Sequence, residues 1–93
     1  MTESCFIKIS GIVQGVGFRY YTLRRAQQIG IEGYVANNDD GTVSVYAVAP
    51  DKVKLESFSE LLKNGPPLSS VERIEIDWRP GPQKYKINGF DIK

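Results

Sequence analysis

The order of hydrophobic patterns along the 93 residues predicts an α+β fold whose elements follow one another as β-α-β-β-α-β, with a short final strand. Apolar and polar residues alternate in four segments, which is typical of strands with one buried face. In two other segments apolar residues recur every three or four positions, which is typical of helices with one buried side. Glycine, proline or an Asp-Gly pair separates these segments.

The first strand is expected over residues 4–13, where one face carries Cys5, Ile7 and Ile9 and the other carries Phe6, Lys8 and Ser10. Phe6 adds an apolar side chain to the opposite face, which indicates a central strand rather than one at the edge of the sheet. A glycine-containing loop over residues 14–18 ends this strand.

The first helix is expected over residues 19–29. Leu23, Ala26 and Ile29 lie at helical spacing and predict its buried side. Gly30 is expected to end the helix, because glycine adopts positive φ without steric cost.

Residues 31–38 and 42–49 are expected to form a β-hairpin. Between them lie Asp39, Asp40 and Gly41, and an Asp-Gly pair tolerates the left-handed geometry of a tight turn. We interpret both aspartates as turn residues and assign them no chemical role.

The second helix is expected to begin at Pro50 and Asp51, with Leu55 and Phe58 on its buried side. The Gly-Pro-Pro sequence at residues 65–67 ends it, because proline cannot continue the hydrogen-bond ladder of a helix.

A further strand is expected over residues 71–78, followed by a loop over residues 79–83 and a short strand with Phe90 and Ile92. The complete order is the split βαβ, or ferredoxin-like, pattern. It predicts a sandwich with two helices on one face of a mostly antiparallel sheet of four to five strands. The length suffices for one such domain, which we expect to span residues 1–93.

The charge balance argues against a polyanionic partner. A net charge of +1 lacks the basic excess of a typical nucleic-acid-binding domain.

The first residues lack the pattern of a signal peptide, and no apolar run approaches the ~20 residues that span a bilayer. Cys5 is the only cysteine, which fits a reducing compartment, and we interpret it as a small core or semi-exposed thiol rather than a nucleophile. We therefore expect a cytoplasmic monomer without nucleic-acid or membrane partners.

The loop before the first helix has the composition of an anion site. Gly15, Val16, Gly17 and Phe18 lead into the helix, and Arg19 occupies its first turn. Glycines let backbone N–H groups converge on a ligand, and a helix N-terminus adds about half a positive charge. An arginine is unfavourable beside that charge unless an anion lies between them. On the glycines alone, a plain strand-to-helix turn with a solvated arginine remains the alternative.

Two segments together carry a specific resemblance. Residues 13–19, VQGVGFR, and residues 33–41, GYVANNDDG, closely resemble the acylphosphatase family. The resemblance continues through residues 65–67, 70–74 and 89–93, so that it covers nearly the whole chain.

The resemblance implies the ferredoxin-like fold and hydrolysis of the carboxyl–phosphate bond of acyl phosphates to a carboxylate and inorganic phosphate. It also implies that Arg19 binds the phosphoryl group and that Asn37 positions the attacking water. The Gly-aromatic-Val-x-Asn spacing selects Asn37 rather than Asn38. Two positions depart from the family pattern: Tyr34 stands where tryptophan is frequent, and Asn38 stands where an apolar residue is usual.

This chemistry fits the residues that the chain offers. A carboxylate leaves without an acid to protonate it, and phosphoryl transfer asks the protein mainly for positioning and charge stabilisation. A loop of N–H groups, an arginine and a water-orienting amide supply both. The sequence has no histidine and no metal-ligand cluster, so we expect neither a metal nor a cofactor. The resemblance implies that the substrate's own phosphate takes the proton of the water.

Two alternatives stay open. One is a non-catalytic or weakly catalytic module that binds phosphate or carbamoyl phosphate, since a similar domain begins the hydrogenase maturation carbamoyltransferase. That protein continues into zinc-binding and further domains, whereas this chain stops at Lys93, which favours the enzyme. The other is a ferredoxin-like RNA binder, which the charge balance and the lack of a basic-Gly-aromatic pattern disfavour.

Other residues that follow the loop have plainer interpretations. Tyr20 and Tyr21 are expected to pack against the domain, and Arg24 and Arg25 to form a solvated helix face. The hydroxyl of Thr22 is expected to steady the loop.

Overall fold

The computed structural model describes residues 2–83 and 85–93. Its elements are β1 (Glu3–Ile12), α1 (Phe18–Ile29), β2 (Glu32–Asn37), β3 (Val43–Ala49), α2 (Lys52–Asn64), β4 (Ser70–Asp77) and β5 (Phe90–Ile92). The predicted elements are confirmed, with bounds that differ by two residues or fewer. No helix in these ranges combines the length and the apolar character that crossing a bilayer requires.

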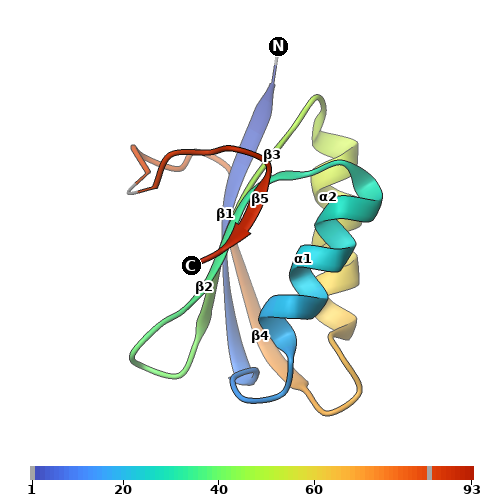
Figure 1. Cartoon of the computed structure of the whole chain (residues 1–93), viewed down its shortest axis with the longest axis vertical. Helices are drawn as coiled ribbons and strands as arrows, with labels where there is room; N and C mark the ends of the chain where they lie inside the picture. The colour runs from blue at the N-terminus through green and yellow to red at the C-terminus, as the bar shows by residue number, and fades with distance from the viewer. Residues whose placement is uncertain (1, 84) are drawn as a thin grey trace.

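The strands of the described chain form a sheet in the order β4-β1-β3-β2-β5, and both helices pack on the same face of it (Figure 1). β1 pairs antiparallel with β3 and β4, and β2 pairs antiparallel with β3. The short β5 runs parallel to its neighbour β2. The predicted ferredoxin-like α+β fold is therefore confirmed, and β1 lies inside the sheet as expected.

The core lies between the sheet and the two helices. Every second residue of β1 faces the helices, and Ile7 and Ile9 are fully buried there. Leu55 and Phe58 of α2 are fully buried against them, as the helical spacing predicted. This packing fixes the direction of β1 and therefore the place where the loop into α1 begins.

The buried side of α1 agrees with the prediction at Ala26 but is shifted toward Phe18 and Thr22. Its buried residues are Phe18, Thr22 and Ala26, whereas Leu23 and Ile29 are half-buried. Thr22 is tolerated at the centre of this side because its hydroxyl donates to the Phe18 carbonyl at 2.9 Å. The pattern of apolar residues missed this shift because threonine counts as polar in such a pattern.

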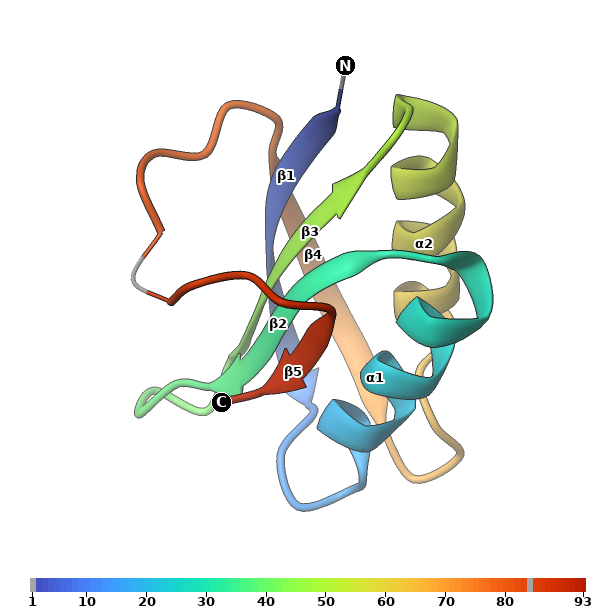
Figure 2. The same cartoon turned by 45° about the horizontal axis from the view of Figure 1, so that its top comes forward.

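Between β4 and β5, residues 78–83 and 85–89 lie on the side of the sheet away from the helices (Figure 2). The Tyr34 hydroxyl donates to the side chain of Gln83 at 2.8 Å, and the Tyr85 ring meets the Tyr34 ring edge-on with centroids 5.0 Å apart. Tyr34 is therefore buried, although it points away from the helices. The residue that departs from the family pattern at this position still fills a packed aromatic site.

Candidate active site

The loop between β1 and α1 owes its shape to two glycines. Gly15 has a φ of 73° and Gly17 a φ of 80°, values that other residues adopt rarely. A Cβ built on either residue would meet no atom within 4 Å. Glycine is therefore required here for the backbone conformation and not for want of space.

α1 begins without a side-chain cap. Gly17 occupies the N-cap position, and the first turn contains no acidic residue. Within the described ranges, the first N–H of this helix to donate is that of Tyr21, to the Gly17 carbonyl at 3.0 Å. By contrast, Asp51 caps α2 by accepting from the Lys54 N–H at 2.9 Å. The N–H groups that precede Tyr21 are thus left for solvent or a ligand, and a helix N-terminus favours an anion.

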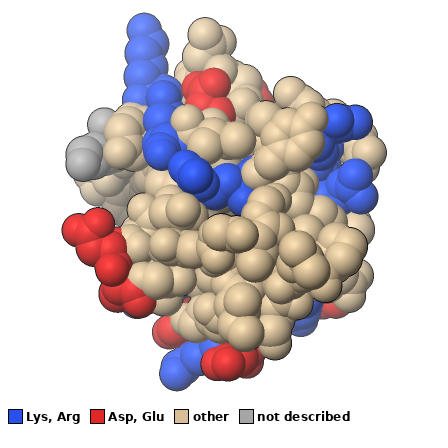
Figure 3. Space-filling model, turned by 60° about the horizontal axis from the view of Figure 1, so that its bottom comes forward, with Lys and Arg blue, Asp and Glu red and all other residues tan. Residues whose placement is uncertain are grey.

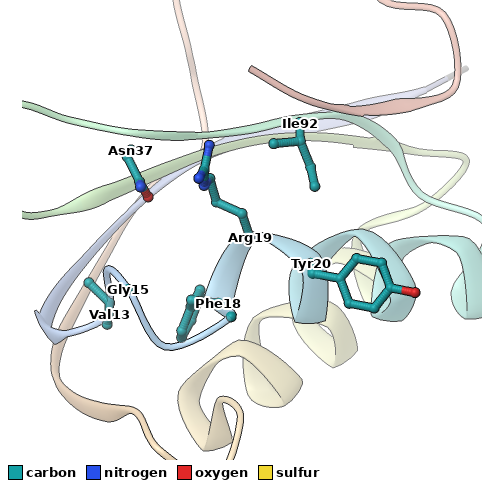
Figure 4. Close-up of a pocket in the computed structure, with 8 residues that line it drawn as sticks. Val13, Gly15, Phe18, Arg19, Tyr20, Asn37 and Ile92 are labelled. Atoms are coloured by element: carbon teal, nitrogen blue, oxygen red, sulfur yellow. The ribbon is translucent and has the colours of Figure 1, made fainter.

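Arg19 and Asn37 lie in one pocket at this end of α1 (Figure 4). The pocket has a volume of about 230 Å³. Arg19 enters it from the first turn of α1, and Asn37 enters it from the last position of β2. Among the residues described, neither side chain has a hydrogen-bond or ion-pair partner. The pocket is lined by Val13, Gly15, Gly17, Phe18, Arg19, Tyr20, Asn37 and Ile92.

The structure brings most of the predicted phosphate-binding loop to this pocket. Gly15, Gly17, Phe18 and Arg19 line it, and Phe18 is also part of the buried core. Val16 does not line it, because its side chain packs against the core. Any contribution of Val16 to the site therefore comes from its backbone N–H.

The two adjacent asparagines have different surroundings. The side-chain amide of Asn38 donates to Thr42 Oγ1 at 2.9 Å and to Ser44 Oγ at 2.7 Å, which ties it to the hairpin. The exposed Asn37 makes no such bond within the described chain. Of the two side-chain amides, the one without a partner in the described chain is that of Asn37, the residue that the sequence spacing selected.

Gln14 is a functional candidate that the sequence did not single out. Its Nε2 atom donates to the carbonyl oxygens of Asn38 and Thr42, in both cases at 2.8 Å. These carbonyls flank the turn between β2 and β3, so Gln14 joins the glycine loop to the hairpin that carries Asn37. The only sequence signal for Gln14 was its position directly before Gly15, because both of its hydrogen-bond partners are remote in sequence.

Tyr20 and Arg25 differ from their predicted roles. Tyr20 is 58% exposed and lines the pocket, whereas Tyr21 packs against the core and its hydroxyl donates to the Leu61 carbonyl at 2.8 Å. Arg24 is exposed as predicted, but Arg25 is half-buried, with its guanidinium carbon 5.2 Å from the Tyr21 ring centroid.

The titratable groups with the clearest structural roles lie outside the pocket. Burial raises the pKa of the Cys5 thiol to about 11, which fits its interpretation as an inert core residue. Hydrogen bonds from Thr42 lower the pKa of Asp40, whose carboxylate closes the β2–β3 turn. In the described ranges, no three Cys, Asp or Glu side chains gather in a way that would hold a metal ion.

The end of the molecule that carries the β1–α1 loop presents a largely uncharged face (Figure 3). Lys and Arg atoms run across the upper half of this view, while Asp and Glu atoms lie toward its margins.

Comparisons with known proteins find relatives in sequence and in fold over most of the chain. The family model for Acylphosphatase matches residues 5–92. An acylphosphatase of Archaeoglobus fulgidus is 50% identical over 70 residues, which cover 75% of this chain and 78% of the relative. The crystal structure of acylphosphatase from Bacillus subtilis has a TM-score of 0.86 and 35% identity, and the match covers 100% of this chain and 99% of that chain.

A crystal structure of full-length HypF in the phosphate- and nucleotide-bound form is also similar, with a TM-score of 0.84 and 32% identity. That match covers 100% of this chain but 12% of HypF, so the likeness concerns one part of a much longer protein. The acylphosphatases match over most of their own length, and the family model spans nearly all of this sequence. The chain therefore belongs to the acylphosphatase family.

Proposed function

We propose that residues 15–19 bind the phosphoryl group of an acyl phosphate and that Asn37 orients the water that hydrolyses it. Membership of the acylphosphatase family supports this reaction class. The observation that carries the assignment is the pocket shared by Arg19 and Asn37 at the uncapped N-terminus of α1.

A phosphoryl group suits this end of α1 for three physical reasons. Free backbone N–H groups of the loop and the first turn donate to its oxygens. The planar guanidinium of Arg19 matches two of those oxygens with parallel hydrogen bonds. The negative charge also relieves the unfavourable placement of an arginine at the positive end of a helix.

The proposed reaction is an in-line displacement at phosphorus. Water attacks phosphorus, the bond to the bridging oxygen breaks, and the acyl carboxylate leaves with the electron pair. Asn37 holds the water by hydrogen bonding, while Arg19 and the loop N–H groups stabilise charge on the phosphoryl oxygens. The proton of the water passes to a phosphoryl oxygen, so that the products are a carboxylate and inorganic phosphate.

Hydrolysis of benzoyl phosphate in the presence of a chelator tests the proposal. The Arg19→Ala and Asn37→Ala variants are each expected to lose roughly 10²–10³-fold in kcat. Arg79→Ala and Asn64→Ala are the matched controls, because these exposed residues lie outside the pocket. Circular dichroism and thermal unfolding check that each variant is folded.

Two outcomes would change the assignment. If folded wild type is inactive but inorganic phosphate raises its Tm, the chain binds phosphate without catalysis, as the alternative binding module would. If Arg19→Ala hydrolyses benzoyl phosphate as fast as the Arg79→Ala control, the role proposed for Arg19 is wrong.

A further inference from the structure

We infer that Tyr20 and Ile92 bind the acyl group, and that the enzyme prefers acyl phosphates whose acyl group is apolar. This inference rests on the proposed function, because it takes the phosphoryl group to lie at Arg19. Both residues line the pocket, and neither belongs to the predicted site.

Tyr20 and Ile92 lie on the other side of Arg19 from Asn37 (Figure 4). β5 runs parallel to β2, with Ile92 in register with Val35. Side chains two positions apart on a strand share a face, so Asn37 lies on the same face as Val35 and Ile92. Ile92 and Asn37 therefore both face α1, at opposite ends of the pocket.

The direction of the reaction places the acyl group beside these two residues. In-line displacement puts the attacking and leaving oxygens on opposite sides of phosphorus. With the water at Asn37 and the phosphoryl group at Arg19, the leaving carboxylate points toward Tyr20 and Ile92. The acyl substituent, which continues beyond the carboxylate, then passes between them.

The surface that meets the acyl substituent is hydrocarbon. Tyr20 is 58% exposed and Ile92 is 40% exposed, so both have apolar surface that a ligand removes from water. The Tyr20 hydroxyl points away from Arg19, which leaves the ring as the part nearer the phosphoryl site (Figure 4). A small polar acyl group such as a carbamoyl group would leave this surface uncovered.

Arg24, one turn further along α1, contacts the side chain of Tyr20. Its Nη1 donates to the Tyr20 hydroxyl at 3.0 Å, and its guanidinium carbon lies 5.7 Å from the ring centroid. The arrangement presents the Tyr20 ring to the pocket and keeps the charge of Arg24 at the outer end of the side chain.

The test compares kcat/KM for benzoyl phosphate with kcat/KM for acetyl phosphate in each variant. Tyr20→Ala and Ile92→Ala are each expected to lower this ratio by roughly three- to tenfold. This effect is smaller than the discrimination that an enclosed hydrophobic pocket achieves for one methylene group, because the site is half open to solvent. Tyr20→Phe is expected to keep the ratio, because it keeps the ring. Val53→Ala is the matched control, since Val53 is an exposed apolar residue outside the pocket.

Inhibition by inorganic phosphate shows whether the phosphoryl site is intact, because phosphate has no acyl group. In Tyr20→Ala and Ile92→Ala, the inhibition constant of phosphate is expected to change much less than the ratio of kcat/KM for benzoyl phosphate to kcat/KM for acetyl phosphate.

An unchanged ratio in both alanine variants would overturn the inference and leave the proposed function standing. A preference for an acyl phosphate with a second anionic group, lost in Arg24→Ala, would overturn the apolar class. If wild type hydrolyses neither substrate, the proposed function itself fails.

Discussion

The side-chain amide of Gln14 donates to the backbone carbonyl of Asn38 at 2.8 Å, across 24 positions of sequence. The same nitrogen donates to the Thr42 carbonyl at 2.8 Å. Asn37 directly precedes Asn38, so these two bonds fix the position of Asn37 relative to the loop that begins at Gly15. Gln14 lines no part of the pocket and is therefore a positioning residue.

Removal of the Gln14 amide should lower the rate more than it weakens anion binding. Gln14→Ala is expected to reduce kcat by roughly 10–100-fold, because small displacements between reacting groups are costly. The inhibition constant of inorganic phosphate should change little, because Arg19 and the loop N–H groups remain. Gln28→Ala, an exposed glutamine of α1, is the control. Equal effects on kcat in the two variants would contradict a positioning role.

The two adjacent asparagines should separate activity from stability. Asn37→Ala removes an amide without a partner in the described chain, so it should lower kcat and leave the free energy of unfolding nearly unchanged. Asn38→Ala removes the bonds to Thr42 and Ser44 and should lower the free energy of unfolding by about 1–2 kcal/mol. Urea unfolding and benzoyl phosphate hydrolysis, measured on both variants, check this. The opposite pattern would assign the water-orienting role to Asn38.

Gly17 should tolerate asparagine better than alanine. Its φ of 80° costs alanine roughly 1–2 kcal/mol, whereas asparagine enters this region more readily. Gly17→Ala should therefore lose stability and activity, and Gly17→Asn should retain more of both. Gly81→Ala is the control, because a Cβ there meets no neighbour and no left-handed φ is required. Equal stability of the alanine and asparagine variants in urea would show that φ is not the cause.

The pH dependence of kcat should follow the substrate rather than the enzyme. The chain has no histidine, the residue whose ordinary pKa lies between about pH 5 and 8. Across this range kcat for benzoyl phosphate should change only with ionisation of the substrate. Any pKa in the pH profile of kcat should therefore match the pKa that titration of free benzoyl phosphate gives. A bell-shaped profile with an additional pKa near about 6.5 would require an enzyme group that this site does not contain.

Cys5 should make the fold less stable at alkaline pH. Burial raises the pKa of its thiol from 9.0 to about 11, so the folded state holds the proton more tightly than the unfolded state. The stability contributed by the neutral thiol is complete below pH 9.0 and falls as the pH rises toward 11. Urea unfolding at several pH values should show a smaller decline for Cys5→Ala than for wild type. Identical declines would mean that the thiol is not protected from solvent.

The elements could be predicted from the sequence because their signals are local. Gly30 ends α1 with a φ of 84°, and its N–H donates to the Ala26 carbonyl at 2.9 Å, as expected of a glycine stop. Asp40 and Gly41 close the hairpin for a similar reason, since both act on their immediate neighbours. Arg19 and Asn37 were candidates because two motifs together resembled a family, and the roles proposed for them await the kinetic tests.

The remaining features depend on contacts between distant segments. Gln14 meets its partners only after β1 and the hairpin have packed side by side. Tyr20 and Ile92 line the same pocket because β5 joins the sheet beside β2, which no local pattern encodes. Thr22 lies on the buried side of its helix although threonine counts as polar, because its hydroxyl donates to the Phe18 carbonyl within the helix.

The pairing of β1 has a consequence for how the chain is made. β1 is synthesised first, yet its partners are Val43–Ala49 and Ser70–Asp77, so it has no partner strand on the ribosome until the first of these has left the exit tunnel. Folding must then close long loops before these contacts form, which slows it relative to a helical bundle of the same length. During that interval the hydrophobic β1 is the segment most exposed to chaperones and to mispairing with other nascent chains.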